Sequence, residues 1–295
     1  MFLNLLYRIL ANFKVLLLAC AMALYLHSSA MAGESLFVMA GSASKPAIEE
    51  LAAAFEKAAG VKVELNIGGS GFLLSQLKLS RKGDIYFPGS ADFIEKAKKE
   101  ELIIATTETK IVYLVPAINV KKGNPKKILN FKGLCEPGIK LVIANPESVC
   151  LGIFAVELAE KNLDAVQKST FRKNIASYVE SCEKTANAIS LGAADAVIGW
   201  SVFEKWDPER IETVRISPDE LVRLSYLSAV VTKYSKNEPL ALKFIEFMKS
   251  PAGIECFKKR GYFTTPEEAT AYAGKKIPIG GNEYAVPPEW TFNEK

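Results

Sequence analysis

Histidine is almost absent from this sequence: its 295 residues contain one, His27. That residue lies in an N-terminal segment that we expect to be removed on export, which leaves a mature chain without histidine. A histidine base, a Ser-His-Asp or Cys-His nucleophile and a histidine metal site are thereby excluded together. The chain also lacks a basic block, with 37 Lys and Arg against 33 Asp and Glu, and therefore gives no support for nucleic-acid binding.

The first 32 residues have the composition of an export signal. Two basic residues precede the apolar run 15–26, and an Ala-x-Ala cleavage site ends at Ala32. We therefore expect residues 1–32 to be cleaved and the mature protein to be periplasmic or extracellular. The apolar run is shorter than the roughly 20 residues that span a bilayer. Membrane anchoring through an uncleaved signal, or through a lipid on Cys20, is the alternative.

Strand and helix patterns alternate along the rest of the chain. Strict alternation of apolar residues over 61–67 predicts a half-buried strand, and the apolar spacing over 46–59 predicts an amphipathic helix. Repetition of this pairing predicts an α/β fold with a mainly parallel sheet covered by helices. The predicted strands are 35–40, 61–67, 84–87, 111–120, 139–144, 195–200, 211–216 and 224–232, and the predicted helices include 46–59, 93–100, 165–178, 239–250, 251–261 and 266–273.

The chain is long enough for two domains of moderate size. A polar Gly/Pro segment near 121–125 separates two sets of elements, and the strand at 224–232 is suited to return the chain to the first sheet. We expect lobe 1 to comprise residues 33–115 plus 226–295, and lobe 2 to comprise residues 116–225.

Serine-containing turns follow predicted strands at four places, each directly before a helix: 40–46, 68–71, 145–152 and 179–185. A helix N-terminus has unpaired N–H groups and a partial positive charge, so several that converge can bind an anion without lysine or arginine. For any single serine, a simple helix cap is the commoner role. Four such turns favour a shared anion site, because open α/β sheets bind ligands beyond the carboxyl ends of their strands.

The turn GGSG at 68–71 is not typical of a catalytic loop. Phe72 stands where the hydrolase elbow Gly-x-Ser-x-Gly has its last glycine, and no Gly-Lys-Ser/Thr follows as in a P-loop. A secreted enzyme that uses carboxylates, for instance Glu147 or Asp195, is the competing hypothesis from another class. The absence of a paired-carboxylate motif makes this alternative the weaker one.

The segments AGSASKP, GGSGFLLSQL, NPESVCLGIFAVELAEK, LGAADAVIGW and KFIEFMKSPAGIECFKKRGYF together resemble the periplasmic molybdate/tungstate-binding proteins, which are solute-binding components of ABC importers. The resemblance implies a type II periplasmic-binding-protein fold, with two α/β lobes joined by two crossovers and a ligand cleft between them. It implies a monomer without catalytic activity or cofactor that binds a tetrahedral oxyanion and delivers it to a membrane permease. Molybdate or tungstate is expected first, and sulfate, phosphate or another anion is the alternative.

By this resemblance, Ser42 and Ser70 correspond to two serine ligands of lobe 1, and Val149 corresponds to a backbone N–H donor of lobe 2. Two positions depart from the family pattern: Cys150 replaces a proline, and Trp200 replaces a common tyrosine. An indole can donate one hydrogen bond but cannot accept one. The candidate ligand-binding residues are Ser42, Ala43, Ser44, Gly69, Ser70, Ser148, Val149, Cys150, Ser181 and Trp200.

A pocket built of donors selects an anion that carries no proton, because protonated phosphate needs an acceptor. No aspartate occurs within the four turns, which disfavours phosphate. Glu147, Glu180 and Glu183 lie close to these turns and are either additional ligands of a six-coordinate molybdate or tungstate, or acids that suit the helix dipole. No separate metal site is expected, and the lack of histidine and of a tyrosine pair argues against ferric iron.

The mature chain keeps four cysteines, Cys135, Cys150, Cys182 and Cys256. Cys150 and Cys182 each stand at the start of a proposed pocket helix, so we expect a disulfide between them in an oxidising compartment. Two independent buried thiols are the alternative. The pairing of Cys135 and Cys256 is left open.

Overall fold

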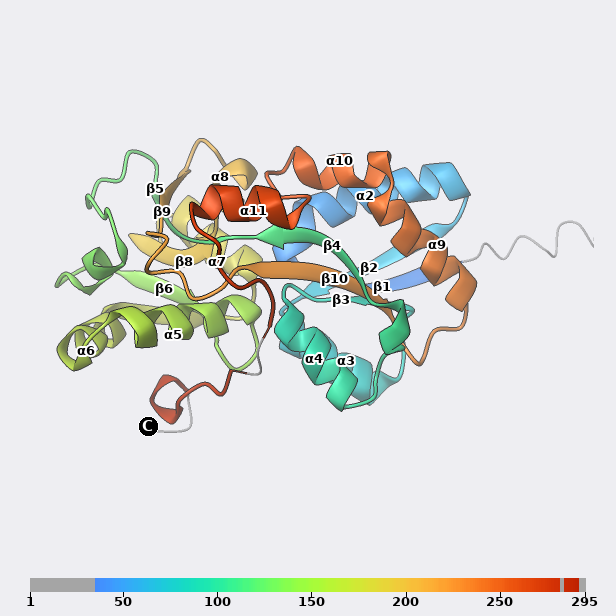
Figure 1. Cartoon of the computed structure of the whole chain (residues 1–295), viewed down its shortest axis with the longest axis horizontal. Helices are drawn as coiled ribbons and strands as arrows, with labels where there is room; N and C mark the ends of the chain where they lie inside the picture. The colour runs from blue at the N-terminus through green and yellow to red at the C-terminus, as the bar shows by residue number, and fades with distance from the viewer. Residues whose placement is uncertain (1–34, 282–283, 292–295) are drawn as a thin grey trace, which may run out of the picture.

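Two five-stranded sheets, each flanked by helices, form two lobes that lie side by side (Figure 1). The computed structural model of the protein describes residues 35–281 and 284–291. The expected export signal at 1–32 and Cys20 lie outside the described residues. None of the helices in the described part of the chain has the length and apolarity needed to cross a bilayer.

The first lobe is built on a sheet of strand order β2-β1-β3-β10-β4. β1 pairs in parallel with β2 and β3, whereas β10 is antiparallel to both β3 and β4. Helices α2, α9 and α10 lie on one side of this sheet, and α3 and α4 lie on the other (Figure 1). The elements are β1 (Ser35–Gly41), η1 (Ser42–Ser44), α2 (Lys45–Ala59), β2 (Lys62–Gly68), α3 (Ser70–Ser80), β3 (Ile85–Phe87), α4 (Ala91–Lys99), η2 (Ala105–Thr107), β4 (Thr109–Leu114), β10 (Ser225–Val231), α9 (Glu238–Lys249) and α10 (Pro251–Lys258).

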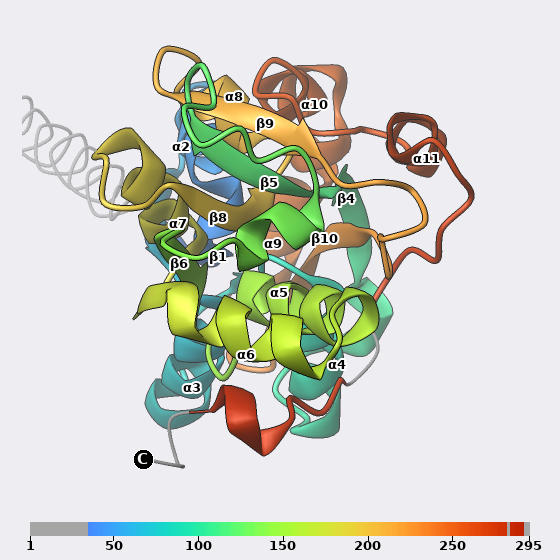
Figure 2. The same cartoon turned by 90° about the vertical axis from the view of Figure 1, so that its left-hand side faces the viewer.

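The second lobe is built on a sheet of order β7-β6-β8-β5-β9. β6 is parallel to β7 and β8, and β5 is antiparallel to β8 and β9. Figure 2 views this lobe, with α5 and α6 running along one side of the sheet. The elements are β5 (Pro116–Lys121), η3 (Phe131–Cys135), β6 (Leu141–Ala144), α5 (Cys150–Asn162), α6 (Ala165–Asn174), β7 (Ile175–Val179), α7 (Cys182–Ser190), β8 (Ala196–Trp200), α8 (Phe203–Trp206) and β9 (Ile211–Arg215).

Three sequence-based expectations are wrong in detail. Both sheets are mixed rather than mainly parallel, because β10 and β5 run antiparallel to their neighbours. The predicted helix 165–178 stops at Asn174, whose side-chain amide donates to the carbonyls of Leu134 and Glu136, and the β-branched segment that follows pairs with β6. The last helix of the closing pair ends at Lys258 rather than at Gly261, which has φ +86° and belongs to the turn beyond it.

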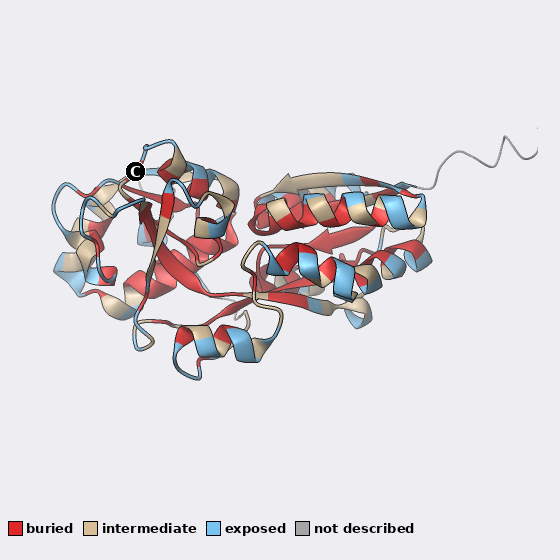
Figure 3. Cartoon of the chain, turned by 90° about the horizontal axis from the view of Figure 1, so that it is seen from above, coloured by how far each residue is buried: buried red, intermediate tan, exposed pale blue. Residues whose placement is uncertain are grey.

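Buried apolar side chains form two clusters. The first occupies the first lobe and extends across part of the second, and the second occupies the rest of the second lobe and part of the C-terminal segment; Figure 3 colours the buried residues red. In the first, Phe55 of α2 meets Phe244 of α9 edge-on at 5.0 Å. This cluster continues into the second lobe through Val149, Cys150 and Trp200. The two lobes are therefore in direct apolar contact at the ends of α5 and β8.

The C-terminal segment begins at α11 (Pro266–Ala273), which lies above α5 in Figure 1. It ends at η4 (Pro288–Trp290), beneath α5 and α6 in Figures 1 and 2. Trp290 is buried in the second lobe's cluster and donates its indole N–H to Glu160 at 2.8 Å. Gly281, further back along the segment, packs so closely on α4 that a Cβ there would be 2.6 Å from the nitrogen of Asp92. The segment thus contacts helices of both lobes.

Candidate functional site

The first serine turn, η1, places one hydroxyl against the second lobe. Ser42 Oγ accepts a hydrogen bond from the backbone N–H of Cys182 at 3.0 Å. Ser44 is turned the other way and donates to the carbonyl of Gly41 at 2.8 Å. The carbonyl of Ala43 accepts from the hydroxyl of Tyr262. Of the three candidate residues in this turn, Ser42 is the one whose hydroxyl meets the second lobe.

Ser70 is the first residue of α3, and Gly69 occupies the cap position before it. The Oγ of Ser70 does not cap its own helix and instead accepts from the N–H of Gly89 at 3.0 Å. Its carbonyl accepts from the hydroxyl of Tyr86 at 2.9 Å. With 2% of its surface exposed, the Ser70 side chain is held inside the protein by partners from the β3 region.

The loop between β3 and α4 is a fifth turn of the same kind, and it was not among the four predicted from the sequence. It contains Gly89 and the fully buried Ser90, whose hydroxyl donates to Asp92 at 2.8 Å. A Cβ at Gly89 would be 2.8 Å from Cys150 Sγ and 3.5 Å from Ser70 Oγ. The motif FPGSADF had the same order of strand, Gly-Ser and helix as the other four turns, so the signal to find it was present.

The glycines of GGSG have a specific packing role. The N–H of Gly71 donates to the carbonyl of Ser148 at 2.8 Å, which joins the two lobes. A Cβ at Gly69 would be 2.5 Å from the carbonyl oxygen of Glu180, and one at Gly71 would be 2.9 Å from that of Ser148. Real side chains do not tolerate such distances, so glycine allows the backbone of the second lobe to reach this turn.

The serines of the second lobe are already engaged. Ser148 donates to a carboxylate oxygen of Glu180 at 2.7 Å, and the Val149 N–H donates within its own turn to Asn145 at 2.8 Å. Ser181 caps α7 by accepting from the N–H of Lys184 at 3.1 Å. The structure therefore does not direct these three groups at Ser42 and Ser70, and Ser181 has the simple cap role.

The three glutamates near the turns have partners within the protein or lie exposed at its surface. Glu180 is exposed and also accepts from the side chain of Asn145 at 3.2 Å. Glu183 of α7 forms an ion pair with Lys45 of α2 at 2.5 Å, a second link between the lobes. Glu147 is exposed, and its backbone N–H donates to Asn145 Oδ1 at 2.9 Å. Among the described residues, no group of three or more His, Cys, Asp or Glu side chains is placed to hold a metal ion.

Cys150 and Cys182 begin α5 and α7, and their sulfur atoms lie 4.0 Å apart. Both are free thiols, so the predicted disulfide is not formed in the structure: the separation is about twice the S–S bond length. The hydrogen bond to Cys182 and burial raise the pKa of Cys150 well above its ordinary value, and Ser70 acts in the opposite direction. The thiol of Cys150 is therefore a neutral neighbour of the Ser70 hydroxyl. Cys135 and Cys256 are also free.

Trp200, at the end of β8, is completely buried and meets the ring of Phe154 edge-on at 5.0 Å. Its indole N–H has no hydrogen-bond partner among the described residues. A buried donor without an acceptor is unfavourable by about 1–3 kcal/mol. The position where the family often has a tyrosine thus holds an unused donor.

A buried ion cluster links the lobes and was not foreseen. Arg223, which precedes β10, donates to Asp92 of α4 at 2.9 Å and to Glu157 of α5 at 2.7 Å. Its guanidinium lies 4.0 Å from the centre of the Phe154 ring. Burial lowers the pKa of Arg223, but the hydrogen bonds to Glu157 and the charge of Asp92 outweigh it and raise the pKa. Burial, with a smaller contribution from the charge of Asp92, raises the pKa of Glu157 against the opposing effect of Arg223.

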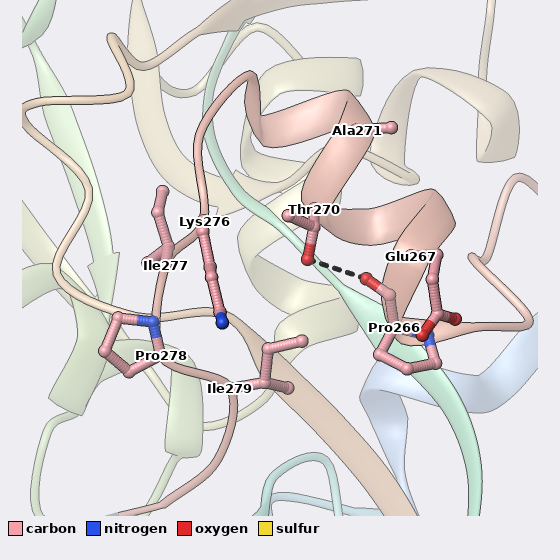
Figure 4. A pocket seen from close by; sticks show the side chains of 8 residues that line it. All are labelled: Pro266, Glu267, Thr270, Ala271, Lys276, Ile277, Pro278 and Ile279. Carbon is pink, nitrogen blue, oxygen red and sulfur yellow. Dashed lines mark hydrogen bonds between the residues drawn. The ribbon is translucent and has the colours of Figure 1, made fainter.

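A groove of about 900 Å³ lies elsewhere, between α11 and the segment that follows it (Figure 4). Its one hydroxyl, on Thr270, already donates to the carbonyl of Pro266 at 2.7 Å. Since its lining is mainly apolar and no set of donors converges there, this groove does not suit a small dianion. It is lined by Pro266, Glu267, Thr270, Ala271, Lys276, Ile277, Pro278 and Ile279.

Comparison with known proteins agrees with this architecture. A putative binding protein of Haemophilus influenzae is 28% identical over 233 residues, covering 77% of this chain and 90% of that protein. The molybdate-binding protein ModA of Rhodobacter capsulatus is 23% identical over 250 residues, covering 83% and 94%. The solved structure of the sulfate-binding protein SubI from Mycobacterium tuberculosis matches with a TM-score of 0.71 at 18% identity, covering 84% and 94%. The family model described as bacterial extracellular solute-binding protein matches residues 36–263, and the chain belongs to that family.

Proposed function

We propose that this protein is the solute-binding component of an ABC importer and that it captures a tetrahedral oxyanion, molybdate or tungstate in the first place. The observation that carries the proposal is the pair of buried hydroxyls at the lobe contact. Ser42 and Ser70 are each 2% exposed, and each accepts a hydrogen bond from a backbone N–H, of Cys182 and Gly89 respectively.

An anion that binds here would exchange places with the serine oxygens in these hydrogen bonds. A hydroxyl that accepts from an N–H still has its own proton to donate. An oxyanion between the lobes would accept hydrogen bonds from the two serine hydroxyls. It would also replace the serine oxygens as the acceptor for the two backbone N–H groups. Hydrogen bonds to a full charge are roughly twice as strong as neutral ones, which favours the exchange. The unused indole N–H of Trp200 is a further donor for the same anion.

The surroundings favour a dianion without a proton. The acceptors that protonated phosphate would need are engaged, since Glu180 is bonded to Ser148 and Glu183 to Lys45. The named ModA relative supports molybdate, and the fold of SubI makes sulfate the second candidate. For a six-coordinate molybdate or tungstate, we propose Glu147 and Glu180 as the additional carboxylate ligands.

The division into lobes is also a proposal. Sheet membership supports residues 33–115 plus 226–295 as lobe 1 and 116–225 as lobe 2, since the chain changes sheet between Leu114 and Pro116 and again before Ser225. The tail is the exception, because Trp290 packs in the second cluster. We also propose that the chain is cleaved after residue 32, that the mature protein is a monomer, and that it delivers its ligand to a membrane permease.

Isothermal titration of the mature protein with molybdate, tungstate, sulfate and phosphate tests this proposal. We expect binding of molybdate and tungstate, weaker binding of sulfate, and little heat with phosphate. Absence of binding to all of the first three anions would refute an oxyanion receptor. A carboxylate-dependent enzyme would instead turn over phosphoryl, acyl or glycosyl model substrates, and we expect no turnover.

A further inference from the structure

We propose that Cys150 and Cys182 form a reversible dithiol–disulfide pair whose redox state sets the affinity of the oxyanion site. The proposal rests on the proposed function, because it concerns regulation of that same site. It differs from a static structural cross-link in assigning a role to both states of the pair.

The two sulfurs lie close enough to bond after a small movement. They come from the first residues of α5 and α7, lie 4.0 Å apart and are almost fully buried. A disulfide needs the sulfurs about 2.05 Å apart, so each has to move by only about 1 Å. Such a movement is within reach of side-chain rotation at two adjacent helix starts.

Both cysteines also lie against the serine-containing turns of the first lobe. Cys182 donates its backbone N–H to Ser42, and Cys150 Sγ lies beside Gly89, whose own N–H holds Ser70. A Cβ on Gly89 would be 2.8 Å from the thiol of Cys150 and 3.5 Å from the hydroxyl of Ser70, so the two groups lie near the same point. In the dithiol state, the Cys150 sulfur thus lies near the Ser70 hydroxyl, and the backbone of Cys182 holds the Ser42 hydroxyl.

The reaction is a thiol–disulfide exchange with a small-molecule or protein disulfide as oxidant. One cysteine, as thiolate, attacks a sulfur of that disulfide and releases the first thiol, and a mixed disulfide results. The second cysteine attacks the mixed disulfide and releases the second thiol. Two electrons pass from the cysteines to the oxidant, and the two protons finish on the released thiols. Because the sulfurs are buried between the lobes, the exchange takes place when the lobes separate.

Oxidation draws the Cys150 sulfur toward Cys182. We infer that this movement leaves more room beside Ser70 for an anion in the disulfide state. We expect molybdate to bind the oxidised protein roughly tenfold more tightly, within the usual range of coupling between sites. Linkage requires the reverse effect as well. Saturating molybdate should lower the reduction potential of the pair by about 30 mV, which is the two-electron equivalent of a tenfold change.

The experiment equilibrates the mature protein in glutathione redox buffers with and without sodium molybdate. Acid quenching, alkylation and mass spectrometry then give the fraction of Cys150–Cys182 disulfide, and titration calorimetry gives the molybdate affinity of each state. The matched control is the Cys135→Ser/Cys256→Ser variant, which keeps the pair and should behave as the parent. The Cys150→Ser/Cys182→Ser variant should bind molybdate with one affinity in every buffer.

The outcomes separate the two proposals. Failure of the disulfide to form in any buffer, or equal molybdate affinity in both states, would overturn the redox proposal while leaving the oxyanion receptor intact. Lack of binding to molybdate, tungstate and sulfate in both states would overturn the proposed function, and this inference with it. A molybdate-dependent shift in the potential would support both.

Discussion

Ser42 Oγ and the backbone N–H of Cys182 are joined by a 3.0 Å hydrogen bond, although 140 residues separate them in the chain. The bond connects η1 of the first lobe to the start of α7 in the second. The contact between the lobes therefore satisfies some of the donors that an anion would otherwise use. Binding exchanges these internal hydrogen bonds for stronger ones to a charge, and substitutions at the lobe contact can separate the two contributions.

Ser70→Ala should weaken molybdate binding by about 1–3 kcal/mol, because a buried charge loses a donor. Isothermal titration measures this loss. Ser75→Ala is the matched control, since Ser75 lies exposed on the same helix and should keep the parental affinity. An unchanged affinity of Ser70→Ala would mean that its hydroxyl serves only the contact with Gly89.

Gly69→Ala should hinder closure of the lobes, because the new methyl group would be 2.5 Å from the Glu180 carbonyl. Overpacking of this kind costs about 1–3 kcal/mol. We expect weaker molybdate binding and a larger radius of gyration by small-angle scattering in the presence of the anion. Gly133→Ala, where a Cβ has 3.6 Å to its nearest neighbour, should change neither. A Gly69→Ala variant that closes normally would contradict the packing role.

Trp200→Phe removes the indole N–H while keeping an aromatic ring beside Phe154. Because that N–H has no partner among the described residues, its loss should not destabilise the ligand-free protein through hydrogen bonding. Molybdate affinity should fall by about 1 kcal/mol or more. Titration calorimetry gives the molybdate affinity, and thermal melts of the protein without added anion give its stability. A fall in stability with unchanged affinity would identify Trp200 as a packing residue only.

Arg223→Met should destabilise the protein by about 3–5 kcal/mol at neutral pH, because it leaves Asp92 and Glu157 buried without a cation. The loss should depend on pH. The folded-state pKa of Glu157 is already raised by burial and would rise further, so the protonated form contributes stability below the unfolded pKa. That contribution is lost as pH rises through the folded pKa. The difference in unfolding free energy between the parent and the variant should therefore become smaller as the pH is lowered.

Denaturant unfolding of Arg223→Met at several pH values measures this dependence. Arg210→Met is the control, since Arg210 forms an exposed pair with Asp207 and its loss should cost less than about 1 kcal/mol. A loss of unfolding free energy that stays constant between pH 4 and 8 would show that charge is not the reason for the destabilisation.

The sequence predicted most elements because their patterns are local. The helix over 266–273 matches α11 at both ends, and the alternating segment 61–67 matches β2 within one residue. The single strand predicted over 111–120 is divided at Val115 between β4 and β5, which belong to different sheets. Apolar periodicity does not reveal such a change, because each half is buried in its own sheet.

The candidate site was predictable as a set of turns but not as a set of contacts. The sequence indicated Ser42 and Ser70, which the structure brings to the lobe contact. It gave no reason to separate Ser44, turned toward Gly41, from Ser42. It also could not reveal the cluster of Arg223, Asp92 and Glu157, because an ion pair across 131 residues depends on how the lobes pack.

The position of β10 has a consequence for how the chain acquires its structure. In the first sheet, β10 lies between β3 and β4, although it follows both by more than one hundred residues. A chain that emerges from its N-terminus therefore cannot complete this sheet until Val231 has appeared, and β4 has no neighbour in that sheet until then. Long-range pairing of this kind slows folding and exposes unpaired edges. A truncation before Ser225 would accordingly remove an inner strand of the first lobe's sheet and leave a fragment prone to aggregation.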